Sequence, residues 1–142
     1  MIKKLILIAI LSVFACGSSN NFAKEMVYFT NYNSAIKYSK NTNKPIMLVV
    51  MSVTCPWCKK LENQILKKSD IDILIRKNFV PLILNKDKDN FPKDKFKVKT
   101  IPTIFFINSE TQDLFHETLG YKSKKNFIKE IEIAKKKYKH IL

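Results

Sequence analysis

The most constraining feature of this sequence is an apolar run of strand length, Ile46–Val53, that ends just before two cysteines. Apolar residues on both faces of a strand imply burial on both faces, as in the central strand of a parallel pair. The run leads directly into Cys55 and Cys58, and Pro56 between them stands where a first helical turn tolerates proline. The sequence therefore predicts a central strand that passes straight into a helix reaching about Lys68.

The remaining patterns alternate between helix and strand. Helices are predicted over 31–43, 71–77 and 123–138, strands over 79–84, 104–107 and 114–119, a charged irregular connection over 86–99 and a hairpin turn over 108–113. A strand, a helix and a strand, followed by a hairpin and a closing helix, predict an α/β fold: a central mixed β-sheet flanked by helices on both faces. With 142 residues and no internal repeat, the chain is expected to form one domain.

The charge balance is strongly basic, with 26 Lys and Arg residues against 12 Asp and Glu, a formal net charge of +14. Such an excess is typical of proteins that bind nucleic acids or membrane surfaces. Only one basic residue is arginine, Arg76, and arginine is the side chain that reads guanine edges and binds phosphates bidentately. Because the lysines are scattered, we interpret them as a solvated surface. We expect no nucleic-acid partner, whereas acidic partners or anionic lipid stay open.

Residues 1–15 have the layout of a secretory signal peptide. Lys3 and Lys4 precede an apolar segment that runs from Leu5 to Ala15 with only Ser12 as an interruption. A transmembrane helix needs about 20 apolar residues, and the polar segment 17–21 follows too soon for one. We therefore predict that the chain is exported.

Cys16 gives the signal a second interpretation. Small or aliphatic residues before a cysteine, here Val13 to Ala15, resemble the lipobox of bacterial lipoproteins, in which that cysteine becomes the lipidated first residue. Under this prediction 1–15 is the signal peptide, 16–25 is a polar tether and 26–142 is the folded domain. The alternative is ordinary cleavage near Ala15 or Ala23.

With Cys16 lipidated or removed, Cys55 and Cys58 remain as a pair. A disulfide ring closed over so few residues contributes little stability. A chemical role therefore explains the cysteine pair better than a structural role. At the start of a helix, free backbone N–H groups and the helix dipole favour a thiolate at Cys55. Cys58, one turn further, is placed to resolve a mixed disulfide formed on Cys55.

Two other interpretations of the pair stay open: half of a zinc site, and an inert structural disulfide. A closed structural zinc site needs four ligands. The other candidates are His116, His140 and carboxylates, and no second spaced pair exists. We therefore assign no metal site and leave both histidines without a role.

Two motifs together resemble the thioredoxin-fold disulfide oxidoreductases, and in particular the exported bacterial thioredoxin-like proteins. They are Cys55-Pro56-Trp57-Cys58 after one apolar strand and Ile101-Pro102-Thr103 before another. The resemblance covers about residues 26–138 and implies the thioredoxin fold, with a cis peptide bond before Pro102 facing the dithiol. It implies Cys55 and Cys58 as the catalytic residues, and as the residues against the substrate Pro56, Trp57, Ile101, Pro102 and Gly120.

The sequence departs from the thioredoxin pattern in two places. Thioredoxins usually carry a buried Asp six positions before the first cysteine, where this chain has Val49, and no carboxylate occurs between Ile46 and Lys60. Trp57 stands where thioredoxin has proline and strong periplasmic oxidants have histidine. Ile101, by contrast, is the thioredoxin choice before the cis-proline and favours reduction.

The resemblance implies a location in the periplasm, either free or anchored to the membrane by lipid on Cys16. We expect a thiol–disulfide oxidoreductase that acts as a reductase on exported proteins and exchanges electrons with a membrane redox partner. Two alternatives stay open: an oxidase that donates its disulfide, and a non-catalytic thioredoxin-like lipoprotein that binds a partner. We expect a monomer with no metal and no cofactor other than the Cys55–Cys58 disulfide.

Overall fold

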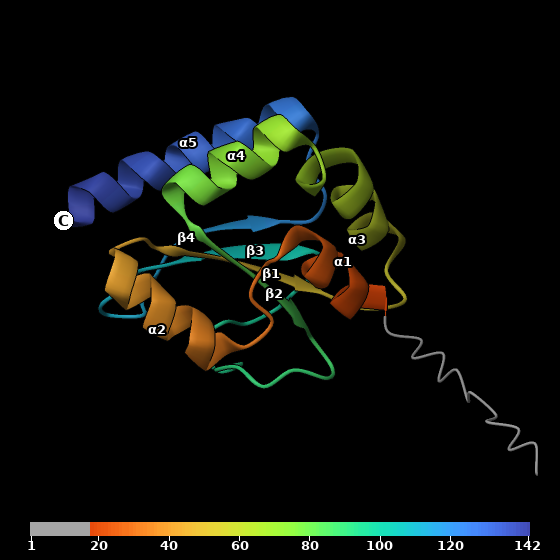
Figure 1. Cartoon of the computed structure of the whole chain (residues 1–142), viewed down its shortest axis with the longest axis horizontal. Helices are drawn as coiled ribbons and strands as arrows, with labels where there is room; N and C mark the ends of the chain where they lie inside the picture. Colours follow the sequence, from red (N-terminus) through yellow and green to blue (C-terminus); the bar gives the residue numbers. More distant parts are fainter. Residues whose placement is uncertain (1–17) are drawn as a thin grey trace, which may run out of the picture.

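The computed structural model of the chain describes residues 18–142 (Figure 1). The predicted signal peptide and the predicted lipidation at Cys16 lie outside these residues. The elements, in chain order, are α1 (Ser18–Met26), α2 (Tyr32–Thr42), β1 (Ile46–Met51), α3 (Pro56–Leu61), the π-helical turn η1 (Glu62–Leu66), α4 (Ser69–Asn78), β2 (Val80–Asn85), β3 (Thr103–Ile107), β4 (Leu114–Leu119) and α5 (Lys124–Ile141). Every strand and helix expected from the apolar pattern is present, with ends shifted by a few residues.

The sheet has four strands in the order β2-β1-β3-β4. Strand β1 pairs in parallel with β2 and antiparallel with β3, and β3 pairs antiparallel with β4. The mixed sheet is therefore confirmed, with the apolar strand Ile46–Met51 in an interior position. All six of its residues are buried, which agrees with the burial on both faces that the sequence predicts.

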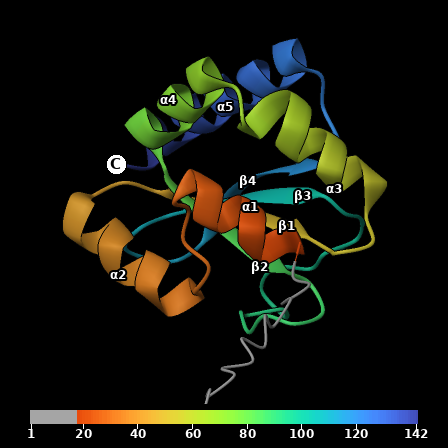
Figure 2. The same ribbon diagram turned by 45° about the vertical axis from the view of Figure 1, so that its right-hand side comes forward.

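Helices cover both faces of the sheet, as predicted (Figures 1 and 2). The odd-numbered residues of β1 belong to a core formed with α1, α3, α4 and α5. The even-numbered residues belong to a second core, formed with α2 and with Phe91 and Phe96 from the connection 86–99. That connection consists of turns without a regular helix, and its two buried aromatic rings attach it to the sheet.

Helix α1 corrects one prediction. The segment 16–25 was expected to be a polar tether, but its described part, from Ser18 onward, lies in a helix. Phe22 is 3% exposed and Ala23 is fully buried, both in the core that α1 shares with α3, α4 and α5. The segment looks polar in composition, but these two apolar residues face one side of the helix and enter the core. The folded domain therefore begins at α1 and not at residue 26. No helix among residues 18–142 is both long enough and apolar enough to span a bilayer.

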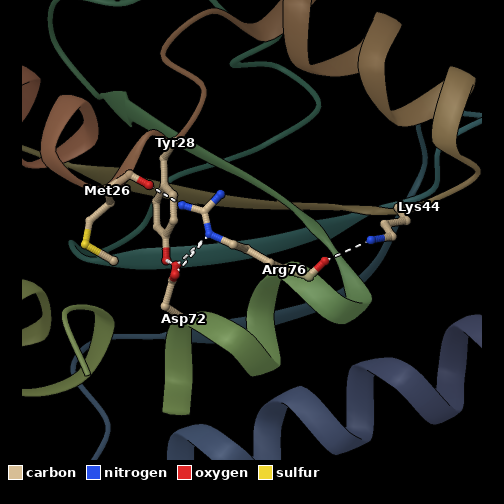
Figure 3. Close-up of polar contacts among 5 residues, drawn as sticks. All are labelled: Met26, Tyr28, Lys44, Asp72 and Arg76. Carbon is tan, nitrogen blue, oxygen red and sulfur yellow. Dashed lines mark hydrogen bonds and ion pairs between the residues drawn. The ribbon is translucent and has the colours of Figure 1, made fainter. Parts of the chain in front are cut away.

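Polar contacts attach the end of α1 to α4 (Figure 3). The hydroxyl of Tyr28 donates a hydrogen bond to Asp72 Oδ1 over 2.7 Å, and Arg76 Nε donates to the same carboxylate over 3.0 Å. The Arg76 guanidinium also donates to the carbonyl oxygen of Met26, and Lys44 Nζ donates to the carbonyl oxygen of Arg76 over 2.9 Å. The single arginine of the chain thus connects parts of the fold to one another.

Tyr28 makes the stability of the domain sensitive to alkali. Burial raises the pKa of its hydroxyl well above the ordinary value, and the hydrogen bond to Asp72 raises it further. Above pH 10 the unfolded chain loses the Tyr28 proton while the folded chain keeps it, so this contribution is complete below pH 10 and falls as the pH rises further. At pH 11 the expected loss is about 1 kcal/mol.

Urea unfolding at pH 8 and pH 11 measures this effect. Tyr28→Phe is expected to be less stable than the wild type at pH 8 by about 1 kcal/mol, because the hydrogen bond is lost. It is also expected to lose less stability between the two pH values. The control is Tyr38→Phe, whose ring is 50% exposed and which should follow the wild type. An unchanged alkaline loss in Tyr28→Phe would contradict the assignment.

Candidate functional site: a disulfide between a strand end and a helix

The two cysteines lie at the carboxyl end of β1, where the chain turns into α3. Cys55 is the N-cap of α3 and has an extended backbone, and Pro56 occupies the first helical turn as expected. Cys55 and Cys58 form a disulfide, with their Cα atoms 5.2 Å apart. The predicted pairing of the two sulfurs is therefore present in the structure.

The backbone around Cys55 is arranged to stabilise negative charge on its sulfur. The N–H group of Cys58 donates to Cys55 Sγ over 3.1 Å, as a helix N-terminal N–H donates to a capping side chain. When the disulfide is reduced, this donor and the helix dipole favour a thiolate at Cys55. Cys58 is 2% exposed and lies within the helix, whereas Cys55 is 6% exposed and lies at its start.

The loop before β3 faces the disulfide. The Ile101–Pro102 peptide bond is cis, as the resemblance implies, and Cys55 Sγ lies 3.8 Å from the carbonyl oxygen of Ile101. The N–H group of Gly120 donates to the carbonyl oxygen of Pro102 over 2.8 Å and so attaches the end of β4 to this loop. Gly120 has φ +72°, a backbone conformation that favours glycine. A Cβ at this position would meet no atom within 4 Å, so the reason for glycine is the backbone conformation and not a lack of space.

An open groove of about 340 Å³ runs beside the disulfide. Its lining includes three of the residues predicted to contact a substrate, and the full set is Trp57, Thr100, Ile101, Gly120 and Tyr121. The Trp57 side chain is 55% exposed, and its ring lies 5.6 Å from the ring of Tyr121. The other two predicted contact residues are not in this lining: Pro56 is exposed and Pro102 is buried.

Comparison with known proteins identifies the family. The model of the thioredoxin-like domain matches residues 32–135, which is more than half of the chain. The chain belongs to the thioredoxin-like domain family. Among curated proteins, the disulfide bond reductase DsbH of Chlamydia pneumoniae is 30% identical over 101 residues, 59% of this chain and 58% of that protein. The match thus spans less than two thirds of the length of this relative.

Solved structures agree on the thioredoxin fold. A thioredoxin from Thermus thermophilus superimposes with a TM-score of 0.68 at 19% identity, covering 78% of this chain and 88% of that one. A DsbH oxidoreductase gives a TM-score of 0.62 at 22% identity, covering 76% and 83%. At these identities the similarity establishes the fold.

This thioredoxin-like site contains a buried carboxylate that sequence reasoning missed. Val49 is buried at the position where thioredoxins carry their aspartate. Glu62 is only 4% exposed, and it is the one buried Asp or Glu among the described residues. It follows Cys58 by one helical turn, and residues four apart lie on the same face of a helix. The spacing from Cys58 is the signal that could have identified it.

Lys59 compensates the charge of Glu62. Its Nζ lies 3.0 Å from Glu62 Oε2, and the two side chains are 45% and 5% exposed. A buried carboxylate requires such a partner, because desolvation penalises the charged form. This thioredoxin-like domain therefore carries its buried carboxylate on η1, four residues after its inner cysteine, instead of on β1. Glu62 is accordingly a candidate acceptor for the proton of Cys58.

The histidines lie away from the dithiol. His116 Nε2 lies 2.7 Å from Glu130 Oε2, and the ring stacks on Phe106, so this side chain connects β4 to α5. His140 is exposed near the end of α5. Within residues 18–142, no three side chains of the His, Cys, Asp and Glu types are grouped in a way that could hold a metal ion.

Proposed function

We propose that this thioredoxin-like protein is a thiol–disulfide oxidoreductase that reduces disulfides in exported proteins. The observation that carries the proposal is the Cys55–Cys58 disulfide at a helix start, with the loop of Ile101 and Pro102 directly against Cys55 Sγ. This arrangement holds one sulfur where a partner can reach it and the second sulfur where it can displace the partner.

The proposed cycle begins with the reduced protein. The Cys55 thiolate attacks one sulfur of a substrate disulfide, and the other substrate sulfur leaves as a thiolate. The mixed disulfide on Cys55 is then attacked by Cys58, which loses its proton to water or to Glu62. The second substrate thiolate leaves and the Cys55–Cys58 disulfide forms. Two electrons have passed to the substrate, and a donor must return two electrons before the next cycle.

The direction of electron flow rests on two supports. Ile101 before the cis-proline is the thioredoxin choice, and the curated relative from Chlamydia pneumoniae is named a disulfide bond reductase. Trp57 between the cysteines and Val49 in place of an acidic residue depart from the thioredoxin pattern and weaken this support. Reductase is therefore the proposal, and oxidase is the second candidate.

The reduction potential of the Cys55–Cys58 pair tests the direction. We expect a value near that of thioredoxin, about −270 mV, in equilibrium titration against a thiol–disulfide buffer. At that potential the dithiol gives electrons away. A value near −120 mV, that of the strongest periplasmic oxidant, would reverse the assignment to disulfide donation.

We also propose that the protein works in the periplasm, exported by residues 1–15 and held at the membrane by lipid on Cys16, with a membrane redox partner as electron donor. The alternative is ordinary cleavage near Ala15 or Ala23, and a cut near Ala23 would fall within α1 and remove part of its buried face. The mass of the mature N-terminus decides between these processing routes, and an unmodified N-terminus after Ala15 would overturn the lipid anchor.

A further inference from the structure

One lysine contacts two residues of the groove beside the disulfide, and two more lysines are next in the chain to residues that line it. Lys60 Nζ lies 4.9 Å from the centroid of the Trp57 ring and 4.8 Å from that of the Tyr121 ring. Lys99 directly precedes the groove residue Thr100, and Lys122 directly follows Tyr121. The positive charges thus come from three separate segments, α3, the loop before β3 and the loop after β4, which meet at this groove.

None of these three lysines has an acidic partner in the described part of the chain. Three other lysines form ion pairs with carboxylates: Lys59 with Glu62, Lys67 with Glu25 and Lys124 with Asp70. Among the described residues, no carboxylate lies within ion-pair distance of Lys60, Lys99 or Lys122. The groove edge therefore carries uncompensated positive charge.

The position of Lys60 is set by the two aromatic rings. A cation over the faces of Trp and Tyr is attracted by their negative π-faces. Tyr121 is itself held in place, because its hydroxyl donates to Gln64 Oε1 over 2.9 Å. Lys60 is thus oriented before a partner arrives. Pairing with a carboxylate in the groove therefore costs less side-chain conformational entropy than pairing with a freely moving lysine.

We propose that this groove selects protein segments in which acidic side chains flank the reacting cysteine. The inference rests on the proposed function and names the substrate class of the same site. Opposite charges on the two partners raise the rate of encounter and fix the register of docking, while like charges are rejected. A partner with Asp or Glu beside its cysteine is therefore attacked faster by Cys55 than one with Lys at the same positions.

Three peptides test the selection. They share one sequence and carry Glu, Gln or Lys on both sides of a cysteine that is blocked as a disulfide with a small neutral thiol. Trp57 is the only tryptophan of the chain and lies between the two cysteines, so its fluorescence can follow oxidation of the reduced protein. We expect the Glu peptide to react about tenfold faster than the Lys peptide at low ionic strength. The ratio should fall towards one in about 1 M salt.

Two triple variants with equal loss of charge assign the effect to the groove. Replacing its lysines by glutamine, as Lys60→Gln, Lys99→Gln and Lys122→Gln together, should reduce the Glu-to-Lys rate ratio to about twofold. The control replaces three exposed lysines on α2 and α5, as Lys37→Gln, Lys40→Gln and Lys136→Gln, and should keep the tenfold ratio.

Two results would overturn the inference: equal rates for the Glu and Lys peptides in the wild type, or an equal loss of the ratio in both triple variants. In the second case net charge alone would account for the preference. A protein that reacts with none of the peptides would instead refute the proposed function, so the two failures are distinguishable.

Discussion

Replacement of Cys58 by alanine is expected to stop the reaction at the mixed disulfide. In the reduced variant, Cys55 still attacks a substrate disulfide, because the Cys58 backbone N–H that stabilises its thiolate is retained in alanine. No second thiol is present at the helix to displace the substrate. The covalent adduct on Cys55 should therefore accumulate to about one equivalent, whereas the wild type releases the reduced product and leaves no lasting adduct.

Mass spectrometry after mixing with a disulfide peptide measures this adduct. The matched control is Cys55→Ala, which keeps only the inner thiol. Cys58 lacks the capping N–H and is 2% exposed, so little adduct should form on it. If Cys58→Ala forms no adduct, the catalytic roles of the two cysteines are wrong. If a Cys55→Ala, Cys58→Ala variant retains full biological activity, the protein is a binding module.

The strands and the dithiol were predictable because their signals are local. The six consecutive apolar residues of β1 avoid water only if both faces of the strand are buried. Cys55 follows a few residues after the end of this strand. Ser123 at the start of α5 and Asn31 at the start of α2 each accept a hydrogen bond from the backbone N–H three residues later, which is how capping residues mark the ends of helices. These features depend only on a few neighbouring residues.

The features that the sequence did not predict depend on contacts between distant segments. The rings of Trp57 and Tyr121 pack at a tilt across 64 positions of the chain, and Arg76 reaches Met26 across 50. Neither pair produces a periodic pattern. Glu62 stands in an ordinary helical sequence, and its burial follows from how η1 packs in the folded domain. The sequence therefore predicted the fold, the pairing of Cys55 with Cys58 and three residues of the groove, but neither the burial of Glu62 nor the contacts of Arg76.

The burial of α1 leads to a large expected effect on stability. Phe22 is 3% exposed, packs edge to face on Tyr28 with ring centroids 6.0 Å apart, and lies under the ammonium group of Lys67 at 5.9 Å. Phe22→Ala removes this ring from the core that α1 shares with α3, α4 and α5. The expected cost in the free energy of unfolding is about 3 kcal/mol, made up of lost burial and of the cavity left behind.

Urea and thermal unfolding measure this cost, and a decrease in Tm of about 10 °C corresponds to it in a domain of this size. Asn21→Ala is the matched control, because Asn21 precedes Phe22 on the same helix and is exposed. It should change the free energy of unfolding by less than about 0.5 kcal/mol. If the segment were the polar tether that composition indicates, both variants would be as stable as the wild type, because a tether contributes no core contacts. Unequal effects of the two substitutions therefore establish that the domain begins at α1.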